Sequence, residues 1–470
     1  MTVLPMTING LAVQSKATFG VIDPATGEFF GQAPDCTEEQ LQLAMDSARS
    51  AFGAWRRDED QRRAMLREAA VAVRQDGERI AGLLTSEQGK PLQDARVEVM
   101  AAAAWLDYYA GLEMPREVVQ DDRSGYAEVL RRPLGVVAAI TPWNFPVTLA
   151  MWKIAPALRA GNTMVLKPSP FTPLATLALG ETLAQVLPPG VLNVISGRDP
   201  LGARMTTHPV PRKISFTGST PTGKAIAAAA SDDLKRVTLE LGGNDPAIIL
   251  DDADPQAIAD QLFWAAFANN GQVCLAVKRV YAPHSLYDDV VEALAERART
   301  VRVGAGAEEG TELGPINNLP QYSRVVGLVE DALQQGAKVA AGGASMNRRG
   351  YFYQPTILAA ASDGIRIVDE EQFGPALPVI AYRNVNDVLE RCNEGPYGLT
   401  ASVWSSDTDR ARRVATELDC GQVAINAHGS GVRPDLPFGG ARWSGIGVEN
   451  GLWGLYGFTE TQVLSVPTAY

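Results

Sequence analysis

Two short runs of the chain carry residues that could act as a nucleophile and a base. Cys274 follows the run NNGQV at 269–273, and Glu240 lies upstream in the run LELGG at 239–243. A lone thiol is usually a buried apolar group. A thiol flanked by Gly and Asn and matched with a carboxylate motif instead suggests a nucleophile that forms an acyl intermediate and a base that assists it. The predicted catalytic residues are therefore Cys274 and Glu240.

Composition restricts the ligands and the partners. The 470 residues are 46% hydrophobic and 20% charged, which predicts a folded chain of about three domains. The net charge is −12 without a long basic block, so nucleic acid and anionic membrane are not expected as partners. We expect a small-molecule ligand instead.

The cysteines and histidines form no recognisable metal or disulfide pattern. The four cysteines lack CxxC pairing and the three histidines are widely spaced. This spacing argues against a metal site, a disulfide framework and a Cys-His dyad. The amino terminus shows no basic segment followed by a long apolar run, and no apolar stretch is long enough to span a membrane. A cytoplasmic protein is expected.

The order of the predicted elements indicates the fold. Helical spacing over 38–110 predicts a helical lead-in with a capped start at Thr37. The alternating residues 126–130, after a polar turn, predict a hairpin-like arm. Strands and helices then alternate over 134–240, with a helix expected from near Ala150 to Arg159, and again over 244–441, which predicts two doubly wound α/β domains.

Two strand ends in the first series could bind a cofactor. The predicted strand 213–216 runs into TGSTPTG at 217–223, and the free N–H groups of the helix that follows could face an anion. This run is not a GxGxxG fingerprint, and a purely structural turn would look the same. Lys167 follows another predicted strand and could bind ribose or phosphate. A solvated lysine before a rigid turn is the alternative.

Motifs along nearly the whole chain resemble those of the aldehyde dehydrogenase superfamily. They are TPWNFP at 141–146, LKPS at 166–169, FTGS at 216–219, ELGG at 240–243, GQVC at 271–274, EQFGP at 371–375 and PFGG at 437–440. No single motif is decisive, but their common order is hard to obtain by accident. The resemblance is to NAD(P)-dependent, non-acylating members that release an acid by hydrolysis.

The resemblance implies a division of the chain into two domains and an arm. Residues 1–113 and 134–240 would form an NAD(P)-binding Rossmann-like domain, and residues 241–442 a catalytic domain. Residues 114–133 and 456–470 would form a small β arm that joins subunits into a homodimer or homotetramer. An exposed edge strand needs such a partner on physical grounds as well.

The resemblance also implies a mechanism for oxidising an aldehyde. Cys274 would attack the carbonyl carbon, and the side-chain amide of Asn144 would hydrogen-bond the oxyanion together with the backbone N–H of Cys274. After hydride loss, Glu240 would activate the water that hydrolyses the thioacyl intermediate. Lys153 and Glu449 match positions of a proton relay, and an ordinary surface ion pair is the alternative.

The cofactor is expected to be NAD or NADP. By resemblance, Glu371 would hold the nicotinamide ribose and Phe373 would pack against the ring. The other expected cofactor residues are Thr141, Trp143, Lys167, Ser169, Gly218, Ser219 and Gly223. Pro170 takes the place of an acidic residue that often holds the adenosine ribose, so the choice between the two cofactors stays open.

The expected aldehyde tunnel is mostly apolar. Its predicted lining is Phe145, Trp152, Val273 and Leu275, with the loop 428–433 as a further candidate. Relatives that act on succinic semialdehyde tend to carry an arginine where this chain has Trp152, so a medium aliphatic or aromatic aldehyde is predicted. A carboxylated aldehyde is the alternative if Arg433 and Asp435 point inward.

Other functions compete with this expectation. A CoA-acylating relative would not usually retain Glu240, and an esterase or amidase would leave the cofactor motifs unexplained. A non-catalytic binding or structural protein of the same fold would be expected to lose the reactive residues, whereas Cys274, Glu240 and Asn144 are all present.

Overall fold

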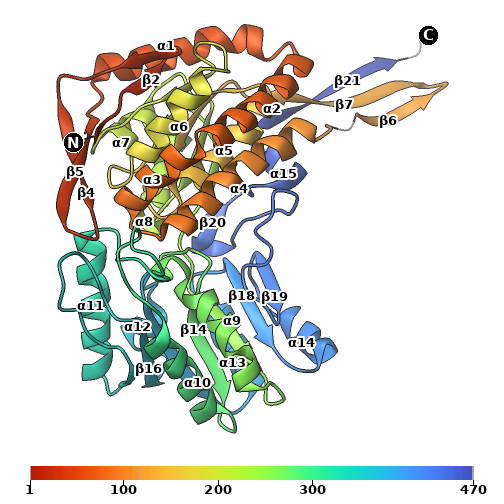
Figure 1. Cartoon of the computed structure of the whole chain (residues 1–470). Helices are drawn as coiled ribbons and strands as arrows, with labels where there is room; N and C mark the ends of the chain where they lie inside the picture. The colour runs from red at the N-terminus through yellow and green to blue at the C-terminus, as the bar shows by residue number, and fades with distance from the viewer. Residues whose placement is uncertain (1, 115, 468–470) are drawn as a thin grey trace.

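The computed structural model describes residues 2–114 and 116–467 (Figure 1). Position 1 of the first predicted domain, and positions 115 and 468–470 of the predicted arm, lie outside the described residues. The described residues form two large sheets, a small sheet near the N-terminus and an arm.

The first large sheet has the strand order β20-β12-β11-β8-β9-β10-β2-β3. Its central strands are parallel and mostly buried: β8 (Val136–Ile140), β9 (Thr163–Lys167), β10 (Leu192–Val194), β11 (Lys213–Thr217) and β12 (Arg236–Glu240). Short antiparallel strands complete its edges: β2 (Met6–Ile8), β3 (Leu11–Val13) and β20 (Gly445–Ile446). Because parallel strands end at one edge, Lys167, Thr217 and Glu240 all lie along the edge where ligands usually bind.

Helices pack on this sheet and on one another (Figure 1). They are α1 (Glu38–Trp55), α2 (Glu59–Gln75), α3 (Gly77–Gln88), α4 (Leu92–Gly111), α5 (Pro146–Arg159), α6 (Leu174–Ala184), α7 (Leu201–Thr207), α8 (Thr220–Ser231) and α15 (Gly451–Tyr456). The predicted lead-in over 38–110 thus consists of separate helices. Helix α1 starts with the expected capping box of Thr37 and Gln40. Helix α3 stops at Gly89, whose φ of 97° is left-handed.

The second large sheet has the strand order β15-β16-β17-β14-β13-β18-β19. Its parallel strands are β13 (Asp245–Ile249), β14 (Val277–Pro283), β16 (Thr356–Ala361), β17 (Ala376–Tyr382), β18 (Thr400–Trp404) and β19 (Gln422–Ile425), and β15 (Lys338–Ala341) is antiparallel. Its helices are α9 (Pro255–Phe267), α10 (Tyr287–Thr300), α11 (Leu319–Gln334), α12 (Arg366–Asp369), α13 (Val385–Glu394) and α14 (Thr408–Ala415). Large apolar clusters fill the space between the strands and these helices.

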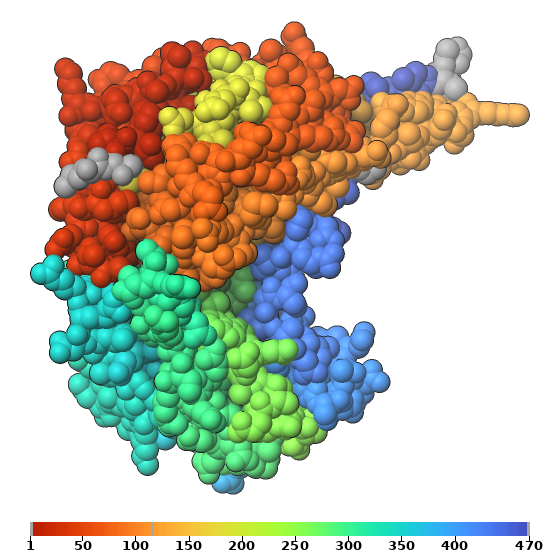
Figure 2. All heavy atoms as spheres, viewed as in Figure 1, coloured from red at the N-terminus to blue at the C-terminus, as the bar shows by residue number. Residues whose placement is uncertain are grey.

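The arm combines segments from distant parts of the chain. Its strands are β6 (Glu117–Asp122), β7 (Gly125–Pro133) and β21 (Thr459–Pro467), with β7 between the other two. The predicted hairpin strand at 126–130 is longer in the structure, where β7 extends from Gly125 to Pro133. β7 also pairs along its whole length with β21. The arm protrudes from the body in Figure 2, and apolar side chains such as Val463 and Val466 are exposed on it.

Two parts of the fold differ from the sequence-based expectation. A small sheet of β1 (Thr2–Val3), β4 (Thr18–Asp23) and β5 (Glu28–Pro34) was not predicted, since β1 is very short and β4 and β5 contain glycine and charged residues that weaken a strand pattern. Helix α5 starts at Pro146, before the predicted start near Ala150, because proline suits the first helical position. Among the described residues, no helix is long and apolar enough to cross a membrane.

Candidate active site

The segment before Cys274 has a strained backbone. Helix α9 ends, and Asn269, Asn270 and Gly271 follow with φ values of 50°, 58° and 72°. Left-handed conformations are unfavourable for residues other than glycine, so consecutive ones persist only where the surroundings enforce them. A Cβ on Gly271 would lie 2.3 Å from the carbonyl oxygen of Gly374, so glycine is required at this position.

Side chains from other parts of the fold hold the carbonyl groups around Cys274. The hydrogen bonds are Asn144 Nδ2 to Gln272 O (3.0 Å), Lys278 Nζ to Val273 O (2.5 Å) and His428 Nε2 to Leu275 O (2.6 Å). Burial lowers the pKa of His428 to about 4, so its ring is neutral and donates from Nε2. Both neighbours of Cys274 in the chain are thus fixed through their carbonyl groups.

Asn144 is itself held by a buried ion pair. The backbone carbonyl oxygen of Asn144 accepts hydrogen bonds from Lys90 Nζ at 3.0 Å and from Asn269 Nδ2 at 3.1 Å. Lys90 pairs with Glu98, and both side chains are 1% exposed. The Glu98 carboxylate also accepts the N–H groups of the first turn of α5. No sequence signal marks Lys90 or Glu98, because charged side chains in a helical stretch usually face solvent.

Glu240 lies in a buried group of charges at the end of β12. Burial raises its pKa well above the usual range, nearby Glu449 raises it further, and Lys153 opposes both. Lys153 Nζ pairs with Glu449 at 2.6 Å and donates to Thr217 Oγ1 at 2.7 Å. Because the side chains of Lys153 and Glu449 are at most 1% exposed, the alternative of a surface ion pair is wrong.

The thiol of Cys274 is protonated at neutral pH in this state. Burial raises its pKa to about 12, and the nearby carboxylates Glu240 and Glu371 act in the same direction. Lys278 acts in the opposite direction but does not compensate. Attack on a carbonyl therefore requires a base or an added positive charge near the sulfur.

Two cavities meet at Cys274 and Asn144, which line both of them. One cavity, of about 390 Å³, lies over the ends of the first sheet. Of the expected cofactor residues, its lining contains Trp143, Gly218, Ser219, Glu371 and Phe373. The lining residues that sequence reasoning missed are Pro142, Thr217, Thr220, Pro221, Leu241, Gly242, Gln321, Arg324 and Tyr397.

The other expected cofactor residues, Thr141, Lys167, Ser169 and Gly223, do not line this cavity. Lys167 is 5% exposed, and burial lowers its pKa to about 8, so the alternative of a solvated lysine is wrong. Gly223 lies on α8, where a Cβ would meet the Leu241 side chain at 2.5 Å. Its position therefore allows α8 to pack closely against the end of β12.

The 390 Å³ cavity has groups that fit a nicotinamide dinucleotide. Helix α8 starts there with Ser219 as its N-cap, so backbone N–H groups are available for a phosphate. The half-buried Glu371 carboxylate accepts one hydrogen bond from Gly243 N–H at 3.0 Å and has further capacity for ribose hydroxyls. The rings of Trp143 and Phe373 lie 5.3 Å apart edge to face and give the cavity an aromatic wall.

The second cavity, of about 790 Å³, is mostly apolar. Its lining includes all the expected tunnel residues, Phe145, Trp152, Val273 and Leu275, together with Val97, Trp105, Leu149, Trp264 and Val432. Arg433 and Asp435 pair with each other at 2.6 Å as side chains that are 60% and 41% exposed, and neither lines the cavity. The only lysine or arginine among its lining residues is Lys90, which Glu98 neutralises.

We predict that alkylation of Cys274 by iodoacetamide, without cofactor, accelerates about tenfold per pH unit between about pH 7 and 10, because only the thiolate reacts. This follows from the raised pKa of about 12. Mass spectrometry of the modified peptide measures the rate, and Cys274→Ala identifies the signal. A rate that stops rising near pH 8.5, the usual thiol pKa, would contradict the prediction.

We also predict that Gly271→Ala lowers turnover by roughly 100-fold, because a displaced nucleophile loses its alignment. Gly336→Ala is the matched control: it has a φ of 97° but no heavy atom within 4 Å of the added Cβ. It introduces similar backbone strain without a clash, so its turnover should match that of the parent protein. Steady-state kinetics on both variants measures the difference, and equal losses would contradict the prediction.

Comparison with known proteins gives a consistent result. The sequence model of the aldehyde dehydrogenase family matches residues 12–464. Phenylacetaldehyde dehydrogenase from Pseudomonas fluorescens is 39% identical, covering 96% of this chain and 93% of the relative. The NAD⁺ complex of an aldehyde dehydrogenase from Bacillus cereus superposes with a TM-score of 0.96 at 36% identity, covering 99% of this chain and 97% of that one. An E. coli NADP dependent enzyme superposes with a TM-score of 0.96 at 34% identity over 99% and 98% of the two chains. The predicted fold is confirmed, and the chain belongs to the aldehyde dehydrogenase family of oxidoreductases.

Proposed function

We propose that this enzyme oxidises a medium aliphatic or aromatic aldehyde to the carboxylic acid, with NAD or NADP as cofactor. The observation that carries the proposal is that Cys274 and Asn144 line both cavities. An aldehyde carbon bound where the two cavities meet lies next to the Cys274 thiol and the Asn144 side-chain amide. Its side chain occupies the apolar cavity, and the polar cavity remains for the dinucleotide.

The first step forms a covalent intermediate. The sulfur of Cys274 bonds to the aldehyde carbon, its proton passes to the Glu240 carboxylate, and the carbonyl oxygen becomes an oxyanion. Asn144 Nδ2 carries two hydrogens, of which one is donated to Gln272 O. The other hydrogen and the backbone N–H of Cys274 stabilise the oxyanion. When bound, the oxidised nicotinamide supplies the acceptor for the hydride that leaves the carbon.

The second step hydrolyses the thioacyl enzyme. Once Glu240 has passed the thiol proton of the first step to the Lys153–Glu449 pair, it takes one proton from water as the water oxygen bonds to the acyl carbon. The carbon–sulfur bond then breaks, the second water proton returns to the sulfur to restore the thiol, and the acid leaves as its carboxylate. A raised carboxylate pKa makes Glu240 a stronger base near neutral pH. Lys153 and Glu449, which pair beside Glu240, then receive the proton.

The cofactor assignment rests on the polar cavity and on the likeness to NAD and NADP complexes. Glu371 holds the nicotinamide ribose, Phe373 supports the ring, and the α8 N-terminus with Ser219 faces the pyrophosphate. Pro170 has no carboxylate to repel a 2′-phosphate, so use of both cofactors is consistent with the site. Residues 1–113 and 134–240, which contribute every strand of the first sheet except β20, then form the cofactor domain, and residues 241–442 provide the catalytic domain.

The substrate class follows from the apolar cavity. Its aromatic and aliphatic lining favours burial of a hydrocarbon chain or ring. Asp94 and Glu312 also line it, and Lys90 is neutralised by Glu98. A substrate carboxylate would find no free cationic partner among these residues. Binding of a semialdehyde is therefore weakened by the free energy needed to bury its unpaired charge.

The test is reduction of NAD and, separately, NADP with phenylacetaldehyde, hexanal and succinic semialdehyde. We expect kcat/KM for the apolar aldehydes to exceed that for the carboxylated one by at least about tenfold, because an unpaired buried charge is costly. Cys274→Ala should lose roughly 1,000-fold or more of the turnover, whereas Cys36→Ala, a partly buried thiol elsewhere, should lose none. Turnover retained by Cys274→Ala would overturn the mechanism, and a preference for succinic semialdehyde would overturn the substrate class.

We further propose that the arm joins subunits, because β6 and β21 expose strand edges and apolar side chains. Val463→Lys combined with Val466→Lys should lower the assembly mass in sedimentation velocity, since it places charge on the exposed strand. Leu319→Lys, at a residue 54% exposed on α11, is the control. An unchanged mass in the double variant would contradict a role of the arm in assembly.

A further inference from the structure

Lys213 is a buried lysine that the proposed mechanism leaves without a role. Because strand residues alternate, its side chain lies on the same face of β11 as those of Ser215 and Thr217. In β12, Thr238 pairs in register with Ser215, and Glu240 pairs with Thr217. We call Glu240, Thr217, Ser215, Thr238 and Lys213 the polar row. It extends from the proposed base along both strands to their opposite ends.

Hydrogen bonds link two members of the polar row to each other and a third member to Glu449. Lys213 Nζ donates to Thr238 Oγ1 at 2.6 Å, and Ser215 Oγ donates to Glu449 Oε1 at 3.4 Å. Ser215 and Thr238 are direct partners on strands about 4.8 Å apart, so rotation of their side chains brings the hydroxyls together. A hydroxyl both donates and accepts, which allows it to accept one proton and release another.

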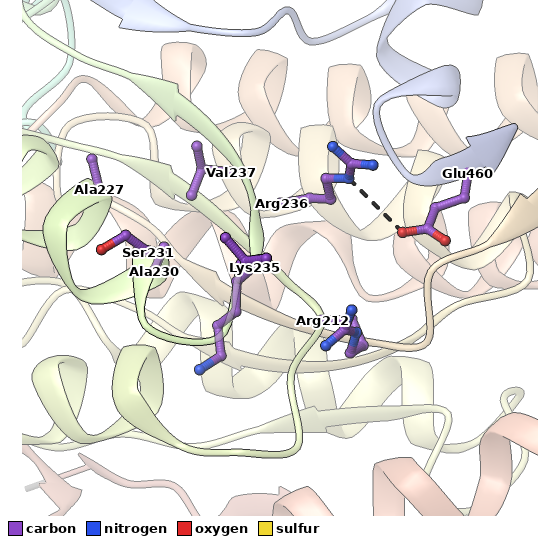
Figure 3. A pocket seen from close by; sticks show the side chains of 9 residues that line it. Arg212, Ala227, Ala230, Ser231, Lys235, Arg236, Val237 and Glu460 are labelled. Atoms are coloured by element: carbon purple, nitrogen blue, oxygen red, sulfur yellow. Dashed lines mark ion pairs between the residues drawn. The ribbon is translucent and has the colours of Figure 1, made fainter.

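The polar row ends near solvent. Arg236 pairs in register with Lys213, its side chain is 68% exposed, and it lies 3.8 Å from the carboxylate of Glu460. Figure 3 shows these two side chains at a surface cavity of about 510 Å³, which Arg212 and Lys235 also line. Water at this surface therefore contacts Arg236, the register partner of the buried Lys213.

The opposite face of the same strands is apolar. Ile214, Phe216 and Leu239 belong to a hydrophobic cluster under α8. The hydroxyls and the amine are thus confined to the face that contains Glu240. Burial of a lysine without a carboxylate bonded to it is unfavourable, so its presence at the end of this row calls for a function.

The surroundings of Lys213 allow its amine to exchange protons near neutral pH. Burial lowers its pKa to about 7; Lys153 and Arg236 act in the same direction, and Glu449 opposes them. The Phe458 ring lies 4.9 Å from Nζ. A neutral amine is available above this pKa to accept a proton.

We propose that the polar row is a proton exit path with Lys213 as its last buried member. The proposal rests on the proposed function, in which Glu240 takes a proton from the hydrolytic water. That proton passes through Glu449 to the Ser215 hydroxyl, which releases its own proton to Thr238, and Thr238 protonates the Lys213 amine. Lys213 then releases a proton to water beside Arg236. No group in the row is oxidised or reduced. After one proton has passed, each group has regained its starting protonation state.

The test follows decay of the acyl enzyme directly. Enzyme and cofactor are mixed with phenylacetaldehyde, quenched in acid at successive times and analysed by intact mass. Lys213→Met keeps the length of the side chain but cannot carry a proton. We expect acyl formation at the parent rate, and decay roughly tenfold slower at pH 7. The parent decay rate should rise with pH through about 7, and this dependence should disappear in the variant.

Controls separate a proton path from a structural effect. Lys235→Met removes another buried ammonium, which pairs with Asp233, and should decay at the parent rate. Ser215→Ala and Thr238→Val remove hydroxyls without changing charge and should also slow decay. Added imidazole should restore decay in Lys213→Met by carrying the proton.

Decay and pH dependence equal to the parent in Lys213→Met, or a loss in acyl formation, would overturn the path. Absence of any Cys274 acyl enzyme in the parent would instead overturn the proposed function.

Discussion

The junction between the two large sheets is the constraint on which the site depends. Cys274 belongs to the half of the chain that forms the second sheet, and Asn144 follows a strand of the first. The hydrogen bond from Asn144 to Gln272 O crosses that junction, and Lys90 and Asn269 fix Asn144 through its backbone carbonyl oxygen. A small shift between the two sheets would move the Cys274 thiol away from the Asn144 amide. The strained segment before Cys274 is tolerable because so many contacts determine its position.

The charges in the site are arranged as a group that shares protons. Two carboxylates, Glu240 and Glu449, lie near one ammonium, Lys153, in a region that excludes water. Such a group is one negative charge in excess, which burial makes unfavourable. It therefore binds an extra proton readily, and the raised pKa of Glu240 is a property of the group rather than of one residue. The same excess makes a thiolate at Cys274 unfavourable until a positive charge arrives.

The alternation of strands and helices predicted the α/β fold, and the resemblance singled out Cys274, Glu240 and Asn144, of which Cys274 and Asn144 line both cavities. Cys274, Glu240 and Asn144 stand in short motifs whose composition reflects their local backbone. The roles of Lys90 and His428 could not be predicted, because the carbonyl groups that they contact are distant in the sequence. Lys278 contacts the carbonyl group of Val273, which is close in the sequence, but no motif marks that contact. Burial explains the other differences. Lys153 and Lys167 look like surface lysines in the sequence, and only the packing of helices over the sheet shows that they are enclosed.

The late position of Glu449 in the chain has a consequence for biosynthesis. The segment that carries it enters the first sheet through β20 and is followed by β21, which closes the arm against β7. A ribosome has therefore made both large sheets before Lys153 can meet its carboxylate partner. Until that segment docks, the Lys153 ammonium on α5 lacks its Glu449 partner, and the first sheet has an open edge at β12. A nascent chain that ends before this segment would be a natural client for chaperones that bind incomplete sheets.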